Sequence, residues 1–225
     1  MSDKTIVHLV RHGEVYNPAG VLYGRRDGFH LSELGNKMAE RVGEALAGRD
    51  IVHMRTSPLE RAQETAAPLA AARGLTPTIE PRVIESSNKF EGIGFSEGAM
   101  TFVKRPSLLR HMYNPLKPSW GEPYDEITAR MMAAIEDARD EARGHEAVVV
   151  SHQLPIWITR LFLEKRSYLH HPKSRQCTLC SVTSLHFEDD KLRQVAYSEP
   201  AADLIPVADR NAPFSAGGAK PEDRP

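Results

Sequence analysis

Three short apolar runs constrain the fold of this chain more than any other feature of its sequence. Residues 5–10, 51–55 and 147–151 read TIVHLV, IVHMR and AVVVS. Such β-branched runs are typical of strands that are buried on both faces of a sheet. Helix-like segments alternate with these runs along the chain. This alternation predicts an α/β protein of three α/β/α layers with a mostly parallel central sheet.

Capping signals predict where the covering helices begin. Ser57 can cap a helix whose first residue is Pro58, and Glu60 would complete a capping box. Ser32 is a second candidate cap, because a segment with apolar side chains four residues apart follows it. The expected helices run from residue 33 to about 47, from 58 to about 74, from 124 to 143 and from 154 to about 164.

The rest of the chain predicts short strands, one insertion and a tail. The further strands are expected at residues 77–80, 82–84, 181–188 and 192–197, the last two as a closing hairpin. Residues 84–123 mix Gly, Pro, aromatic and basic residues over a stretch too long for an ordinary connection. We expect an insertion, or lid, between Glu85 and Pro123, with some helix around residues 100–113. Residues 1–198 then form a single domain, and 199–225 a weakly ordered tail.

The balance of charges and the lengths of the apolar runs indicate whether the chain binds nucleic acid or a membrane. The chain holds 29 Lys+Arg and 30 Asp+Glu, a net charge of −1, so no basic excess predicts binding to nucleic acid. Residues 1–4 do not resemble a secretory signal, and no apolar run reaches the roughly 18–20 residues of a membrane helix. We therefore expect a cytoplasmic protein with no membrane partner. Two cysteines cannot form a disulfide framework.

Polar side chains follow each of the three main strands. They are Arg11 and His12, then Ser57 and Arg61, then Ser151 and His152. The carboxyl ends of parallel strands share one edge of a sheet, so these side chains are expected to meet there. A guanidinium fork matches phosphate oxygens, and a neutral imidazole can act as a nucleophile while a second one stabilises charge. The set therefore predicts a site for a phosphate ester.

A proton donor for the leaving oxygen is also needed. Glu85 is the best candidate, because it begins the insertion beyond the possible strand at 82–84. The backbone N–H groups of Gln153 and Leu154, at the start of a helix, could add donors to an anion. Each residue also has a structural interpretation by itself: His12 or His152 as an ordinary strand-end histidine, Arg61 as a helix residue paired with Glu60 or Glu64.

Three segments carry a resemblance to a known family. Residues 9–14 read LVRHGE, residues 57–65 read SPLERAQET, and residues 148–152 read VVVSH. In this order and spacing they resemble the motifs of the histidine phosphatase superfamily, also called the phosphoglycerate mutase-like family. The resemblance covers roughly residues 5–163, and the chain looks like a phosphatase-type member.

The resemblance implies a role for each matching residue. His12 would form a phosphohistidine, and Arg11, Arg61 and His152 would hold the transferred phosphoryl group. Glu85 falls where the family keeps its general acid/base. Asn17, Tyr23 and Gly24 fall where the family's loop lines the pocket, and Gln153 follows the second histidine as a further substrate-binding candidate. No metal and no cofactor are implied.

The predicted function is hydrolysis of a small phosphorylated metabolite through a phosphohistidine. Two alternatives stay open: phosphoryl transfer of the phosphoglycerate mutase type, and a module that binds phosphorylated ligands without turnover. A homodimer is a further expectation. Cys177 and Cys180 form a lone C-x-x-C with His170 and His171 nearby, which suggests either a metal site or two ordinary reduced thiols, and we favour the thiols.

Overall fold

The computed structural model describes residues 3–94, 120–170 and 174–205, and in these the chain forms one six-stranded sheet. The strands are ordered β3-β2-β4-β1-β5-β6. Their bounds are β1 Lys4–Arg11, β2 Ile51–Thr56, β3 Thr78–Ile79, β4 Glu146–Ser151, β5 Val182–Glu188 and β6 Lys191–Ser198. The first four strands run parallel, and β5 and β6 form the antiparallel hairpin at one edge.

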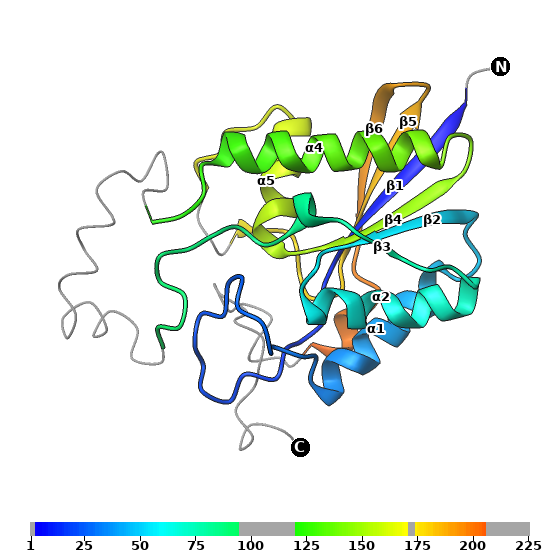
Figure 1. Ribbon diagram of the computed structural model, residues 1–225. Helices are drawn as coiled ribbons and strands as arrows, with labels where there is room; N and C mark the ends of the chain where they lie inside the picture. The colour runs from blue at the N-terminus through cyan, green and yellow to red at the C-terminus, as the bar shows by residue number, and fades with distance from the viewer. Residues whose placement is uncertain (1–2, 95–119, 171–173, 206–225) are drawn as a thin grey trace.

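Helices cover both faces of this sheet (Figure 1). Helices α1 (Glu33–Leu46) and α2 (Glu60–Arg73) pack together on one face, and α4 (Tyr124–Glu141) and α5 (Gln153–Leu163) on the other. The side chains of alternate residues in the parallel strands pack into two separate hydrophobic cores, one on each face of the sheet. Val149 of β4 packs with α4 and α5, whereas Val148 and Val150 pack with α1 and α2. The predicted three-layer α/β fold with a mostly parallel sheet is confirmed.

Close packing against α1 holds the segment that follows β1. A Cβ atom on Gly35 would lie 2.0 Å from the carbonyl oxygen of Glu14, so only glycine permits this approach. Ser32 caps α1 as predicted, because its Oγ accepts from the Gly35 N–H at 2.9 Å. The same hydroxyl donates to the Glu14 carboxylate. These contacts hold Glu14, the residue that follows His12 and Gly13, against the start of α1.

Two predictions of local structure are wrong. Ser57 does not cap α2: that helix begins at Glu60 after Leu59, which provides no side-chain cap, and Ser57 contacts His152 instead. Residues 82–84 are not a strand. Pro81–Val83 form a 3₁₀ turn, because Pro81 suits the first helical position and the Glu80 carboxylate accepts from the Arg82 N–H at 3.0 Å.

The predicted insertion is only partly described. Its two ends run side by side, since the Lys89 N–H donates to the Trp120 carbonyl and the Glu122 N–H to the Ser87 carbonyl. The expected helix around 100–113 and most of the expected tail lie outside the described residues. Among the helices that the structure describes, none is long and apolar enough to cross a membrane.

Candidate active site

The carboxyl ends of β1, β2 and β4 meet at one edge of the sheet, as the sequence predicts. Arg11 pairs with Ser151 in the β1–β4 ladder, and Thr56 pairs with Val150 in the β2–β4 ladder. His12, Ser57 and His152 each follow directly after one of these ends. The rings of His12 and His152 have centroids 5.2 Å apart. The sheet therefore brings together two histidines that are 140 positions apart in the chain.

His12 is held as a neutral imidazole with one nitrogen left available. Its side chain is 1 % exposed, and its Nδ1 lies 2.8 Å from the Gly13 carbonyl oxygen. A carbonyl only accepts, so Nδ1 carries the proton and Nε2 keeps its lone pair. Burial lowers the pKa of His12 well below its ordinary value, and the charges of Arg61 and Arg11 lower it further. A neutral imidazole with a lone pair on Nε2 can act as a nucleophile without a base at neutral pH.

Arg61 brings a buried positive charge to this histidine. It is the second residue of α2 and is fully buried. Its Nη2 donates to the Gly24 carbonyl at 2.6 Å, and its guanidinium lies 4.7 Å from the centre of the Tyr23 ring. Its Nε and Nη1 are buried and have no acceptor among the described residues. An anion at His12 would supply the missing acceptors.

Gly24 shapes the loop that carries this contact. Its φ is +47°, and a Cβ atom there would lie 2.3 Å from Oε1 of Glu91. The left-handed backbone favours glycine, and Glu91 would have to move to admit a larger residue. The turn directs the Gly24 carbonyl at Arg61 and places Tyr23 beside His12, with ring centroids 6.3 Å apart.

His152 is a second buried imidazole with a free ring nitrogen. Its Nε2 lies 2.8 Å from the hydroxyl of Ser57, whereas its Nδ1 is buried with no partner in the part of the chain that the structure describes. Burial lowers the pKa of His152 well below its ordinary value, with a further contribution from the charge of Arg61. If Ser57 donates to Nε2, then Nδ1 carries the proton and can donate to a phosphoryl oxygen as a neutral group.

Glu85 stands where a proton donor is needed. It lines the same pocket as His12, and burial raises the pKa of its carboxyl above the ordinary value. Its Oε1 accepts from the backbone N–H of Ser86 at 2.8 Å. A carboxyl whose pKa is raised holds its proton to higher pH, which is what a general acid requires.

Two arginines from distant segments fix the backbone around Glu85. Arg25 donates to the Glu85 carbonyl at 2.6 Å, and Arg130 donates to the Ile84 carbonyl at 2.7 Å. Both also bind the carboxylate of Glu122, at 2.9 Å from Arg25 and 2.8 Å from Arg130. The position of the Glu85 carboxyl therefore depends on a charge cluster that links the loop before α1 to helix α4.

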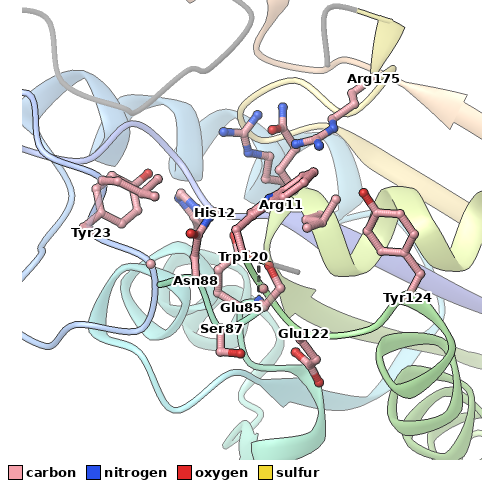
Figure 2. A pocket seen from close by; sticks show the side chains of 16 residues that line it. Arg11, His12, Tyr23, Glu85, Ser87, Asn88, Trp120, Glu122, Tyr124 and Arg175 are labelled. Carbon is pink, nitrogen blue, oxygen red and sulfur yellow. Dashed lines mark hydrogen bonds between the residues drawn. The ribbon is translucent and has the colours of Figure 1, made fainter. Parts of the chain in front are cut away.

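The predicted site residues fall into three groups by position. Several line one pocket (Figure 2): Arg11, His12, Tyr23, Gly24, Glu85 and Gln153. Arg61 and His152 are fully buried behind it. Asn17 is different, because its side-chain amide is engaged with the backbone of Val21 at 2.8 and 3.2 Å, and it holds the loop rather than lining the pocket.

The pocket also contains residues that the sequence analysis did not select. These are Leu22, Ser86, Ser87, Asn88, Trp120, Gly121, Glu122, Tyr124 and Arg175. Leu154, which the sequence analysis selected for its backbone N–H, lines the pocket as well. Arg175 stands out because it is the remaining arginine of this lining beside Arg11. It lies in the loop before β5, next to the two cysteines that were considered as metal ligands. Its neighbours offered no motif that would have indicated a role.

Cys177 and Cys180 are free, buried thiols, and burial raises the pKa of each, that of Cys180 to about 12. The Cys177 carbonyl accepts from Arg11 at 2.8 Å, so this loop orients the arginine of the site. Within residues 3–94, 120–170 and 174–205, no group of three His, Cys, Asp or Glu side chains is arranged to hold a metal ion.

The contact between Ser57 and His152 yields a prediction. Replacement Ser57→Ala should lower kcat/KM for phosphate esters by about 3- to 10-fold. The reason is that Nε2 of His152 loses the hydrogen bond that selects the tautomer of the ring. Product phosphate should bind correspondingly more weakly. Ser184→Ala is a matched control. Like Ser57, Ser184 has a hydroxyl 2.8 Å from a ring nitrogen of a histidine, in this case Nδ1 of His8 in β1. Equal losses in the two variants would contradict a role of Ser57 in the site.

Comparison with known proteins agrees with this geometry. The family model of the histidine phosphatase superfamily (branch 1) matches residues 7–200. The chain belongs to this superfamily. Its relatives include phosphatases and mutases, so the superfamily membership indicates an enzyme of the phosphatase or mutase type.

Three curated relatives of this histidine phosphatase superfamily member illustrate the range. An uncharacterised protein of Mycobacterium tuberculosis, Rv0525, is 52 % identical over 90 % of this chain and 100 % of its own length. A metal-independent phosphoserine phosphatase of Arabidopsis thaliana is 31 % identical over 67 % of this chain and 65 % of its own. The probable phosphoglycerate mutase GpmB of Yersinia pestis is 31 % identical over 67 % of this chain and 70 % of its own length.

A solved structure shows the same fold. YhfR of Bacillus stearothermophilus superposes with a TM-score of 0.74 and 23 % sequence identity, over 89 % of this chain and 100 % of its own. The superfamily fold is thus shared across the whole described sheet and its four helices.

Proposed function

We propose that this protein is a histidine-dependent phosphatase that hydrolyses a small phosphate monoester through a phosphohistidine at His12. The observation that carries the proposal is a set of buried donors around a neutral imidazole. Arg61 Nε and Nη1 and His152 Nδ1 have no acceptor among the described residues, and all belong to side chains around His12. A dianionic phosphoryl group is an acceptor of the right charge for this set.

The reaction would proceed in two balanced steps. In the first, Nε2 of His12 attacks phosphorus, the bond from phosphorus to the ester oxygen breaks, and Glu85 gives its proton to that oxygen. In the second, the oxygen of a water molecule attacks phosphorus while the Glu85 carboxylate takes its proton. The N–P bond then breaks, which releases phosphate and restores the neutral His12. Arg11 and Arg61 would stabilise the charge on the phosphoryl oxygens.

No step of this mechanism needs a metal or an organic cofactor, because the cationic groups come from the chain itself. The pocket has a volume of about 150 Å³, which suits a small leaving group rather than a protein or nucleic acid segment. The proposed location is the cytoplasm, and the proposed assembly is a homodimer.

Mutase activity is the second candidate, since a probable phosphoglycerate mutase is among the relatives. It uses the same first step, but the phosphohistidine would pass its phosphoryl group to a hydroxyl instead of water. The third candidate function is a module that binds phosphorylated ligands without turnover.

The deciding experiment compares phosphate release with isomerisation for 3-phosphoglycerate, and measures phosphate release from p-nitrophenyl phosphate, all in the presence of EDTA. We expect EDTA-insensitive phosphate release and, after a denaturing quench, an acid-labile phosphoryl label on the chain. Isomerisation much faster than release would establish a mutase instead. Phosphate binding without release or label would establish a binding module.

A further inference from the structure

Arg175 is a pocket-lining arginine that the mechanism above does not use. It lies in the loop before β5, and Figure 2 shows its side chain extending into the pocket from the wall opposite Glu85 and Ser87. Its Nε donates to Nε2 of His170 at 2.9 Å. That ring is held in turn, because its Nδ1 lies 2.7 Å from the Tyr168 carbonyl. The guanidinium is therefore positioned by a neutral partner and not by an acid.

The charge of Arg175 has no carboxylate partner in the described parts of the chain. Two other arginines near Glu85 differ: Arg25 and Arg130 each form an ion pair with Glu122. Arg175 forms no ion pair with a described residue, although burial disfavours its charged form. A partly buried, positioned guanidinium that forms no salt bridge with a described residue can bind an anionic ligand.

The charge of Arg175 is not among those that lower the pKa of His12. The charges that act on His12 are those of Arg61 and Arg11. Arg175 interacts with Tyr124 and Glu85, which favour its charged form, and with Arg11, which opposes it. Glu85 must contact the leaving oxygen if it is to protonate it. Glu85 and Arg175 line opposite sides of the pocket, so a leaving group that receives the proton of Glu85 would lie between them.

The surrounding wall fits a small carbon skeleton with a polar end. Tyr124, Leu154 and Trp120 also line the pocket and offer apolar surface. Tyr124 also packs against the ring of His170, with centroids 6.4 Å apart, so its phenol belongs to the same cluster as Arg175. The planar fork of a guanidinium matches the two oxygens of a carboxylate.

We propose that Arg175 binds a carboxylate on the leaving group, so that the preferred substrates are phosphate monoesters of small carboxylic acids. This inference rests on the proposed function only in that both concern the same pocket. Arg175 would be a specificity-determining residue: it selects the leaving group and takes no part in the transfer to His12.

The test uses two esters that differ in one group. 3-Phosphoglycerate carries a carboxylate where glycerol 3-phosphate carries a hydroxymethyl group. We expect the wild-type protein to favour the carboxylate ester by roughly 10- to 100-fold in kcat/KM, and Arg175→Met to bring this ratio close to one. Arg175→Lys should retain part of the preference, because it keeps the charge without the fork. Arg166→Met, which removes an exposed arginine outside the pocket lining, is the matched control and should keep the wild-type ratio.

A binding measurement separates this inference from the proposed function. The dissociation constants of the same two esters are measured by calorimetry with His12→Ala and with His12→Ala/Arg175→Met. A preference for the carboxylate ester that disappears with Arg175 supports the inference, even if the wild-type protein releases no phosphate and the proposed function fails. An unchanged ratio in Arg175→Met, or the absence of any preference in the parent proteins, overturns the inference while leaving phosphatase activity intact.

Discussion

Replacement of His12 by alanine should lower kcat for hydrolysis of p-nitrophenyl phosphate by about 10⁴-fold or more, because the proposed reaction loses the atom that attacks phosphorus. The remaining donors, Arg11, Arg61 and His152, should still bind a phosphoryl group in this variant. KM and the inhibition constant of product phosphate should therefore change much less than kcat. The measurement is steady-state kinetics, together with the phosphoryl label, which should vanish.

His145→Ala is the matched control for this variant. His145 is exposed and precedes β4, so it lies at the opposite end of that strand from His152, and its ring contacts only the exposed Asp50 among the described residues. We expect wild-type kinetics from it. Thermal unfolding of both variants checks that the buried substitution leaves the protein folded. Turnover by folded His12→Ala close to that of the wild type would eliminate the phosphohistidine mechanism.

Replacement Glu85→Gln should have an effect that depends on the leaving group. An alkoxide leaves poorly without a proton, so hydrolysis of an alkyl phosphate should fall by roughly 10²- to 10⁴-fold. Nitrophenolate leaves readily, so p-nitrophenyl phosphate should lose less than about 10-fold in the phosphorylation step. The ratio of the two losses, measured in single-turnover experiments, separates proton donation from simple damage to the pocket. Equal losses for both esters would refute the role of Glu85 as the acid.

The role of Glu85 also predicts the direction in which the rate of hydrolysis changes with pH. Burial raises the pKa of Glu85, and only the protonated carboxyl can act as the acid. Alkyl phosphate hydrolysis should therefore decline as the pH rises through the pKa of Glu85, and Glu85→Gln should lack this decline. His12 must be neutral, and its pKa is lowered, so mildly acidic pH should not protonate the nucleophile. Glu33→Gln, an exposed substitution in the first turn of α1, should keep the wild-type profile.

Sequence patterns predicted the part of this protein that depends on local chemistry. Buried strands require β-branched apolar runs, and parallel strands end at one edge, so the sequence by itself places Arg11, His12 and His152 together. The cap of α1 by Ser32 followed from the same kind of rule. The cap predicted at Ser57 failed, because a buried histidine competes for the same hydroxyl and no local pattern records such a partner.

Only the tertiary structure decided which charges the site uses and how strongly they act. The lowered pKa of His12 and the raised pKa of Glu85 both arise mainly from burial, which the whole fold produces. Arg25 reaches Glu122 across 97 positions of the chain, and Arg175 enters the pocket from a loop without a motif. Such contacts depend on how distant segments pack, because the chain brings them together only when the sheet and both helical layers have formed.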